Sequence, residues 1–287
     1  MDRIYLLAPA LLLLATLLLS FAVYCLLCAL GHTPNVKQIK HNQFFGLFMA
    51  RFLLWVLGPV ERLLLGRVSP NTITALSLLM CAIAGVAAGL GHLGGSVWAF
   101  SMAGILDVLD GRLARLSNRQ TSSGALFDSV SDRWGELFAF AGYAWFLHDS
   151  PWLLAVIAVM GASQMVSYTR ARAEGLGIAL SGGLMQRAER VFVVVSGTLL
   201  AAWYGADPET IDRVEPILGC TMLICGAAST GTALNRWLTA YRELARRDVT
   251  AALTPAEPAV PANGPVSVPE IFAPIPKALR ESAELPL

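Results

Sequence analysis

The sequence predicts an all-α integral membrane protein, and three observations point to it: composition, long apolar stretches and the placement of basic residues. Of the 287 residues, 55% are hydrophobic and 14% are charged, whereas about 25% of the residues of a typical soluble domain are charged. Crossing a bilayer as a helix takes about 20 mostly apolar residues. Seven stretches approach or exceed this length, near residues 4–30, 71–90, 94–116, 124–147, 151–169, 187–205 and 214–238.

The basic residues predict which side of the membrane each helix end faces. With seven spans and segment 32–70 in the cytoplasm, all of the 21 Lys and Arg except Arg3 and Arg213 lie at or near the cytoplasmic face. An excess of Lys and Arg on the cytoplasmic side is the general rule for membrane proteins. We therefore expect the N-terminus outside and the C-terminus inside.

The chain divides into four predicted regions. Residues 1–31 hold an apolar run that exceeds the 7–15 residues of a signal-peptide core, so we interpret it as a retained extra transmembrane helix. Residues 32–69 interleave basic and aromatic side chains, which favours a cytoplasmic amphipathic helix at the membrane interface over a simple linker. Residues 70–248 contain the other six spans. Residues 249–287 hold 8 of the 15 prolines, which indicates a Pro/Ala-rich disordered tail.

Four aspartates occur close together in this apolar sequence, at positions 107, 110, 128 and 132. A carboxylate inside a membrane costs about 2.5–3.5 kcal/mol even on the most lenient scale, so it marks a functional site by default. Asp107 and Asp110 are three residues apart, and Asp128 and Asp132 are four apart, so each pair shares one face of its helix. Only residues 116–123 join the two helices, which are therefore expected to be antiparallel neighbours with facing carboxylates.

Facing carboxylates of this kind suit a hard divalent cation such as Mg²⁺, which binds a few carboxylates together with substrate phosphates. Two such ions can hold both the attacking and the leaving oxygen of a phosphoryl transfer. Gly111 and Gly124 leave room for a ligand next to the backbone, and Arg115 can neutralise a phosphate oxygen. The alternatives are a structural network of Asp and Arg pairs, and a proton or ion relay of a carboxylate-lined transporter. A relay spreads its polar residues along a path, whereas these residues lie at one depth.

The residues from Asp107 to Asp132 read D-x2-D-G-x2-A-R-x8-G-x3-D-x3-D. This pattern is the signature of the CDP-alcohol phosphatidyltransferase family, which the chain resembles over roughly residues 55–245. The resemblance implies a core of six transmembrane helices around a polar cavity that faces the cytoplasm, and often a homodimer. It implies two Mg²⁺ or Mn²⁺ ions held by the four aspartates, with Asp132 also the general base. Contacts to the CDP-lipid are implied for Asn71, Thr72, Ile73, Thr74, Asp107, Gly111, Arg115 and Thr121.

A second resemblance concerns the acceptor. Residues 166–175 read VSYTRARAEG, and residues 183–190 read GLMQRAER. Both segments are similar to elements of the bacterial phosphatidylinositol phosphate synthases, where the first usually reads S-Y-I-K-A-R-A-E and the second E-R-P-E-R. Arg170 stands in place of the Lys, Gln186 in place of the first Glu, and Ala188 in place of the Pro. An arginine cluster suits a dianionic phosphate, although the positive-inside rule alone also enriches such a loop in arginine. The acceptor contacts are expected at Arg170, Arg187 and Arg190.

The sequence therefore predicts a metal-dependent transferase of the bacterial inner membrane, with its site on the cytoplasmic face. We expect it to move a phosphatidyl group from CDP-diacylglycerol to a small polar alcohol, best inositol phosphate, with release of CMP. Glycerol 3-phosphate and free inositol are the alternative acceptors. An ion transporter and a non-catalytic membrane scaffold are the alternative classes. The expected partners are CDP-diacylglycerol, the alcohol or its phosphate, membrane lipids and a second copy of the chain, with no nucleic acid.

Overall fold

The computed structural model describes residues 2–31, 46–118, 120–180 and 182–253, and this part of the chain contains helices but no strand. Within this part, the residues up to Glu243 form one compact unit, and the residues from Leu244 to Leu253 belong to a second. The helices are α1 (Asp2–Ala29), α2 (Gly46–Leu64), α3 (Pro70–Gly89), α4 (Leu93–Leu116), α5 (Ser122–Phe146), α6 (Leu153–Gly175), α7 (Arg187–Gly205), the short 3-10 helix η1 (Pro208–Arg213) and α8 (Val214–Leu253).

Each of the seven predicted spans is a helix, so the all-α prediction is confirmed. Within the described residues, α1, α3, α4, α6 and α8 are long and apolar enough to cross a membrane. The helix α5 carries Asp128, Asp132, Arg133 and Glu136 along its length, and α7 carries Arg187, Glu189 and Arg190 at its start. The membrane crossing of these two helices stays a prediction.

The last helix is longer than expected. It continues to Leu253, past the predicted span end at residue 238 and the predicted domain end at residue 248. Helix-favouring Ala, Arg and Leu fill these positions, and the next proline in the sequence is Pro255, which cannot continue a helix. The predicted tail beyond residue 253, and residues 32–45 of the predicted interfacial segment, lie outside the described residues.

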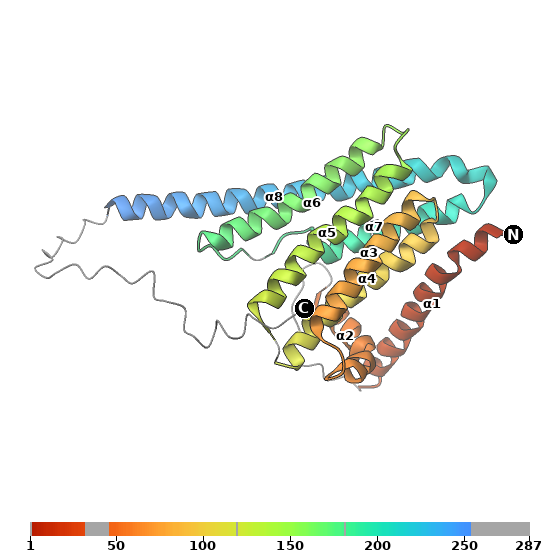
Figure 1. Ribbon diagram of the computed structural model, residues 1–287, viewed down its shortest axis with the longest axis horizontal. Coiled ribbons are helices and arrows are strands. Elements are labelled where there is room, and N and C mark those ends of the chain that lie inside the picture. Colours follow the sequence, from red (N-terminus) through yellow and green to blue (C-terminus); the bar gives the residue numbers. More distant parts are fainter. Residues whose placement is uncertain (1, 32–45, 119, 181, 254–287) are drawn as a thin grey trace, which may run out of the picture. The chain divides into compact units, whose positions relative to one another are not determined.

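The centre of the first unit is a group of three neighbouring helices, α3, α4 and α5 (Figure 1). Gly85 of α3 and Gly142 of α5 allow these two backbones to touch. A Cβ atom at Gly142 would lie 1.9 Å from the carbonyl oxygen of Gly85, and one at Gly85 would lie 2.1 Å from that of Phe138. Small residues commonly permit such close packing between membrane helices.

The main hydrophobic core joins this group to α6, α7 and α8. The helix α8 fits against α6 through Gly226, where an added Cβ would meet Val159, and against α7 at Gly197, where one would meet Thr221. The fully buried residues of this hydrophobic core include Cys81, Ala84, Val156, Val159, Leu218 and Met222.

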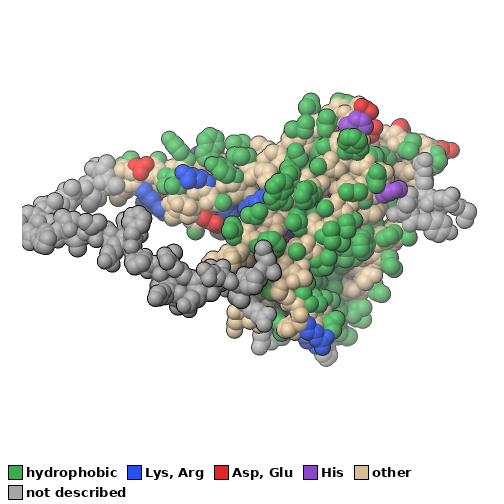
Figure 2. All heavy atoms as spheres, viewed as in Figure 1, with side chains coloured by type: hydrophobic (Ala, Val, Ile, Leu, Met, Phe, Trp, Pro, Cys, Tyr) green, Lys and Arg blue, Asp and Glu red, His purple; other side chains and the backbone are tan. Residues whose placement is uncertain are grey.

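The outer surfaces of these helices are apolar as well. Figure 2 shows that hydrophobic side chains dominate the face over α3 and α5. Leu79 and Val86 of α3 and Leu154 and Ile157 of α6 are among the exposed ones. Soluble monomers rarely expose apolar patches of such extent, and the surface agrees with a protein embedded in a bilayer.

A second, smaller core lies under α2. Leu57 of α2 packs with Ile73 of α3 and with Leu109 and Leu113 of α4. The helix α1 contacts α4, α7 and α2. The helix α2 is thus packed onto the end of α4 that carries the aspartates. A short segment, residues 65–69, follows α2 and ends in Ser69, the cap of α3.

Candidate active site

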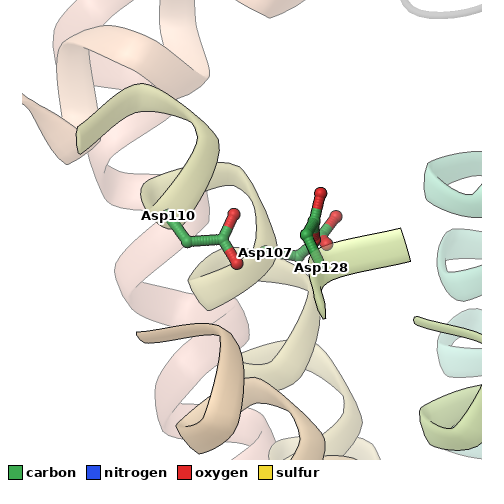
Figure 3. A group of neighbouring side chains, drawn as sticks. All are labelled: Asp107, Asp110 and Asp128. Carbon is green, nitrogen blue, oxygen red and sulfur yellow. The ribbon is translucent and has the colours of Figure 1, made fainter. Parts of the chain in front are cut away.

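Three of the four aspartates meet between α4 and α5. Carboxylate oxygens of Asp107, Asp110 and Asp128 all lie within 4.8 Å of one another. Figure 3 shows Asp107 and Asp128 side by side, with the carboxylate of Asp110 directed toward them. Asp110 is buried, and the other two are partly buried. The expectation that the carboxylates of the two helices face each other is confirmed for these three residues.

Two helix caps position the elements around this cluster. The hydroxyl of Ser69 accepts a 3.1 Å hydrogen bond from the backbone N–H of Thr72 at the start of α3. The hydroxyl of Thr121 accepts a 3.0 Å bond from the N–H of Gly124 at the start of α5. Side-chain caps satisfy N–H groups that have no partner within the helix. They place the first turns of α3 and α5 beside the aspartates of α4.

Thr74 connects the first turn of α3 to the cluster. Its hydroxyl donates a 2.7 Å hydrogen bond to Oδ2 of Asp110, and both residues are 4% exposed. The same hydroxyl lies 3.2 Å from the carbonyl oxygen of Pro70. The bond to Asp110 holds that carboxylate in one orientation.

Asp132 has a different environment from the other three aspartates. One of its carboxylate oxygens lies 2.6 Å from Nη1 of Arg187, and the same guanidinium nitrogen donates a hydrogen bond to Oδ1 of Asp107. Arg187 begins α7, so this helix reaches the cluster through one side chain. Among the described residues, the carboxylates close enough together to share one cation are those of Asp107, Asp110 and Asp128; Asp132 is not part of this group.

The donor set fits a divalent metal. Carboxylate oxygens from two helices, close enough to share one ion, are the ligands that Mg²⁺ and Mn²⁺ prefer. A membrane-buried cluster of like charges also needs a counter-charge. Asp107, Asp110 and Asp128 would hold the ion, while the metal role of Asp132 stays a prediction.

The residues predicted to contact a CDP-lipid lie at the start of α3, at the cap of α5 and beside Asp110 on α4. An added Cβ at Gly124 would lie 3.0 Å from the Thr121 hydroxyl and 3.3 Å from Oδ1 of Asn71. One at Gly111 would lie 3.3 Å from a guanidinium nitrogen of Arg115. Both glycines therefore lie directly under polar side chains of the predicted set.

Two other members of this set have structural contacts. The hydroxyl of Thr72 lies 2.8 Å from that of Ser69, and the side chain of Ile73 is buried in the core under α2. Contacts of Ile73 with a ligand would therefore use its backbone. The ligand roles of all these residues stay predictions.

The three arginines predicted to bind an acceptor differ in their contacts. Arg170 is exposed and pairs with Glu174 at 2.8 Å. Arg187 contacts Asp107 and Asp132, as described above. Arg190 is 3% exposed, its Nη2 lies 2.5 Å from Oε1 of Glu136, and its Nη1 donates to the carbonyl oxygen of Met185 at 3.1 Å. The structure therefore brings only Arg187 directly to the aspartates.

Some residues with defined contacts near the site were not singled out from the sequence. Glu136 follows Asp128 and Asp132 at the same four-residue spacing, so its position on the same face of α5 was detectable. Arg236 of α8 donates from Nη2 to the carbonyl oxygen of Gly182 at 2.8 Å and from Nη1 to that of Val166 at 2.9 Å. It thereby holds the connection between α6 and α7. No local pattern marks Arg236, because its partners are 54 and 70 residues away.

Sequence comparison finds relatives with the same expected chemistry. The family model of CDP-alcohol phosphatidyltransferase matches residues 67–243. Phosphatidylinositol phosphate synthase of Streptomyces avermitilis is 32% identical over 248 residues, 82% of this chain and 95% of that protein. The Mycobacteroides abscessus synthase is 33% identical over 48% of this chain and 66% of that protein. Archaetidylinositol phosphate synthase of Methanothermobacter thermautotrophicus is 32% identical over 64% of this chain and 89% of that protein.

Solved structures agree with the sequence comparison. The phosphatidylinositol phosphate synthase of Mycobacterium tuberculosis with CDP-DAG bound superposes with a TM-score of 0.57 at 27% identity, over 65% of this chain and 94% of that one. The same enzyme in complex with manganese and citrate gives a TM-score of 0.56 at 28% identity, over 64% of this chain and 88% of that one. The family match covers more than half of the sequence and includes all four aspartates. The chain belongs to the CDP-alcohol phosphatidyltransferase family.

Proposed function

We propose that the protein transfers a phosphatidyl group from CDP-diacylglycerol to the hydroxyl of inositol phosphate, with release of CMP. The observation that carries this proposal is the convergence of Asp107, Asp110 and Asp128, with Arg187 of α7 bonded to Asp107. The carboxylates face the first turns of α3 and α5, and Arg187 links them to the segment that resembles the synthases. An ion transporter is disfavoured, because the polar residues form one cluster rather than a path.

The chain's own residues have separable roles in this reaction. Bound Mg²⁺ or Mn²⁺ would stabilise negative charge on the pyrophosphate and on the departing CMP. Thr74 orients Asp110 through its hydrogen bond. Arg115 and the polar groups around Gly111 and Gly124 bind the CDP moiety. Fixed donors of this kind lower a barrier most where charge develops in the transition state.

Asp132 is the proposed base. The acceptor hydroxyl forms a bond to the phosphorus that carries the diacylglycerol, the bond from that phosphorus to CMP breaks, and Asp132 takes the hydroxyl proton. Arg187 lies 2.6 Å from Asp132 and holds the carboxylate in place. A base positioned in this way contributes about 10²–10⁴-fold to the rate.

The acceptor assignment rests on the named relatives and on the basic residues near the cytoplasmic ends of α6 and α7. Three arginines reach this region, and Arg170 is the most exposed of them. Guanidinium groups bind phosphate oxygens with paired hydrogen bonds, so a phosphorylated alcohol fits better than a neutral one. The distribution of Lys and Arg supports a cytoplasmic orientation of this region in a bacterial inner membrane.

The decisive experiment supplies purified protein in lipid vesicles with labelled CDP-diacylglycerol and one acceptor at a time. The acceptors are inositol phosphate, glycerol 3-phosphate, free inositol and serine, and the products are resolved by mass. We expect the fastest CMP release with inositol phosphate, together with a product whose mass is that of phosphatidylinositol phosphate. A preference for an unphosphorylated alcohol would overturn the acceptor assignment, and an absence of CMP release with every acceptor would overturn the transfer reaction. A second copy of the chain as partner stays a prediction, which size measurement in detergent can test.

A further inference from the structure

A buried ion pair connects α2 to the helix that carries the aspartates. Arg112 of α4 donates from Nε and Nη2 to the two carboxylate oxygens of Glu61 of α2, the second bond at 2.9 Å. Glu61 is 6% exposed and Arg112 is 5% exposed. Two parallel bonds between a guanidinium and a carboxylate fix the relative orientation of the groups as well as their distance.

Net stability is a poor explanation for such a pair. The cost of removing two charges from water offsets most of their attraction, and apolar side chains of similar size often replace a buried pair without loss of stability. An apolar contact, however, does not set one orientation between α2 and α4. The bidentate pair does, and orientation matters most where α4 carries reacting groups.

Arg112 lies in the middle of the segment of α4 that faces the proposed substrate. Asp110 and Gly111 precede it directly, and Arg115 follows within one helical turn. Leu109 and Leu113 on either side of it pack against Leu57 of α2. The helix α2 therefore covers the turn of α4 that holds one metal-binding carboxylate and the arginine predicted to contact the CDP-lipid.

The same helix also determines where α3 begins. Only residues 65–69 separate the end of α2 from the start of α3, and Ser69 caps α3 just before Asn71 and Thr74. A shift of α2 relative to α4 would move these groups relative to Asp110. Both sides of the proposed CDP-lipid site thus depend on how α2 is held.

The N-terminal helix braces α2 from its other side. Five aromatic rings meet at this contact, with Phe21 and Tyr24 from α1 and Phe48, Phe52 and Trp55 from α2. Their ring centroids are 5.0–6.2 Å apart, and Tyr24 is 2% exposed. Aromatic rings at this spacing prefer particular relative orientations, so the contact fixes how α2 lies against α1. The family match begins at residue 67, so the aromatic contact between α1 and α2 lies outside the matched residues.

We propose that Glu61 is a positioning residue for the CDP-activated lipid: through Arg112 it holds the substrate-facing turn of α4, and the aromatic contact of α1 with α2 holds Glu61. The inference rests on the proposed function. It concerns the CDP-lipid side of the site, whereas the acceptor side is built by α6 and α7. It therefore predicts a change in the CDP-lipid steps alone.

The first test is Glu61→Gln, which keeps the shape but removes the charge that Arg112 needs. Binding of CDP-diacylglycerol is measured without turnover, and the KM of each substrate is measured with turnover. We expect the Kd and KM of the CDP-lipid to rise about tenfold, because displacement of Arg115 would weaken a charge-assisted contact with the CDP moiety, while the acceptor KM stays unchanged. The control is Glu215→Gln, which changes an exposed glutamate in the first turn of α8 and should leave all three constants unchanged.

Two double variants separate positioning from simple stability. Glu61→Arg combined with Arg112→Glu reverses the pair and is expected to recover much of the CDP-lipid affinity that Glu61→Gln loses. Glu61→Leu combined with Arg112→Met keeps the contact apolar, so we expect a near-normal Tm together with the raised CDP-lipid KM. A normal CDP-lipid KM in this apolar variant would overturn the inference. So would a Glu61→Gln protein with a lower Tm and unchanged Kd and KM.

The aromatic contact between α1 and α2 is tested by Tyr24→Ala. The control is Trp145→Ala, because Trp145 is an exposed aromatic residue of α5. We expect Tyr24→Ala to raise the CDP-lipid Kd in the same direction as Glu61→Gln, and Trp145→Ala to leave it unchanged. An unchanged Kd in Tyr24→Ala would overturn the role of α1. The CDP-lipid Kd does not depend on which alcohol is the acceptor, so a wrong acceptor leaves this test intact. Failure of the unmodified protein to bind CDP-diacylglycerol would instead contradict the proposed function itself.

Discussion

Thr74 and Asp110 are joined by a buried 2.7 Å hydrogen bond between α3 and α4. The bond connects two features that are 36 residues apart in the chain, the first turn of α3 and the aspartate cluster. A hydroxyl that donates to a metal-binding carboxylate fixes which of its oxygens faces the metal. The orientation of Asp110 is therefore set by a residue outside the aspartate motif.

Thr74→Val should impair metal binding without disturbing the fold. Valine keeps the shape and loses the hydroxyl, and a hydrogen bond to a charged group contributes about 1.5–3 kcal/mol. We expect the Mn²⁺ concentration for half-maximal activity to rise by roughly 10- to 100-fold. The Mn²⁺-induced rise in Tm should shift to higher metal concentration in parallel. Thr230→Val, which removes a hydroxyl bonded within α8, is the control, and equal metal curves for the two variants would contradict the prediction.

Removal of metal should abolish the reaction. Excess EDTA is expected to stop CMP release, and Mg²⁺ or Mn²⁺ should restore it. Asp107→Asn, Asp110→Asn and Asp128→Asn should each lose most of the activity and the metal-induced change in Tm, because an amide keeps the shape and drops the charge. Asp212→Asn, an exposed change in η1, should behave as the unmodified protein. Full activity in chelator would exclude a metal-dependent mechanism.

The arrangement of the three clustered aspartates was predictable because it depends on short-range geometry. Spacings of three and four residues place side chains on one helix face, and a short connection keeps the carboxylates of α4 and α5 within reach of one ion. The packing itself was not predicted, because α4 and α5 each pack mainly against α3 rather than against each other. The cap residues Ser69 and Thr121 follow from equally local preferences. Local rules also predicted all seven long apolar helices.

The ion pairs across the site could not be predicted in the same way. Arg112 meets Glu61 across 51 residues, and Arg190 meets Glu136 across 54. Many arginines gather at the cytoplasmic ends of the helices because of membrane topology, so sequence alone cannot assign each one an acidic partner. The sharing of Arg187 between Asp107 and Asp132 depends on how α7 packs against α4, which only the three-dimensional arrangement determines.

Asp132→Asn should separate substrate binding from turnover. If Asp132 accepts the proton of the acceptor hydroxyl, the variant should bind CDP-diacylglycerol normally and lose about 10²–10⁴-fold in kcat. Arg187 retains its contact with Asp107 in this variant, so no large loss of Tm is expected. The control is Asp149→Asn, at an exposed position after α5. Normal turnover in Asp132→Asn together with inactive Asp128→Asn would assign the base to another residue.

Gly124→Ala should weaken binding of the CDP-lipid. The new methyl group would lie 3.0 Å from the Thr121 hydroxyl and 3.3 Å from Oδ1 of Asn71, so both groups must move. A disturbed cap costs about 1 kcal/mol, and a change of that size corresponds to about fivefold in affinity. Gly161→Ala is a matched control, since nothing lies within 4 Å of its added Cβ. Equal CDP-lipid Kd values for the two alanine variants would contradict the proposal that the groups around Gly124 bind the CDP moiety.

Arg170→Ala and Arg190→Ala should have different effects, although both residues were predicted to contact the acceptor. Arg170 is exposed and its pair with Glu174 is worth only about 0.3–0.5 kcal/mol, so its loss should leave the Tm normal. Because Arg170 is proposed to bind the acceptor phosphate, the same loss should raise the acceptor KM by roughly 10- to 100-fold. Loss of Arg190 leaves Glu136 buried without its partner, which costs about 3–5 kcal/mol and should lower Tm strongly. Arg242→Ala, an exposed change on α8, is the control for both measurements. An unchanged acceptor KM in Arg170→Ala would show that this arginine serves membrane topology rather than recognition of the acceptor phosphate.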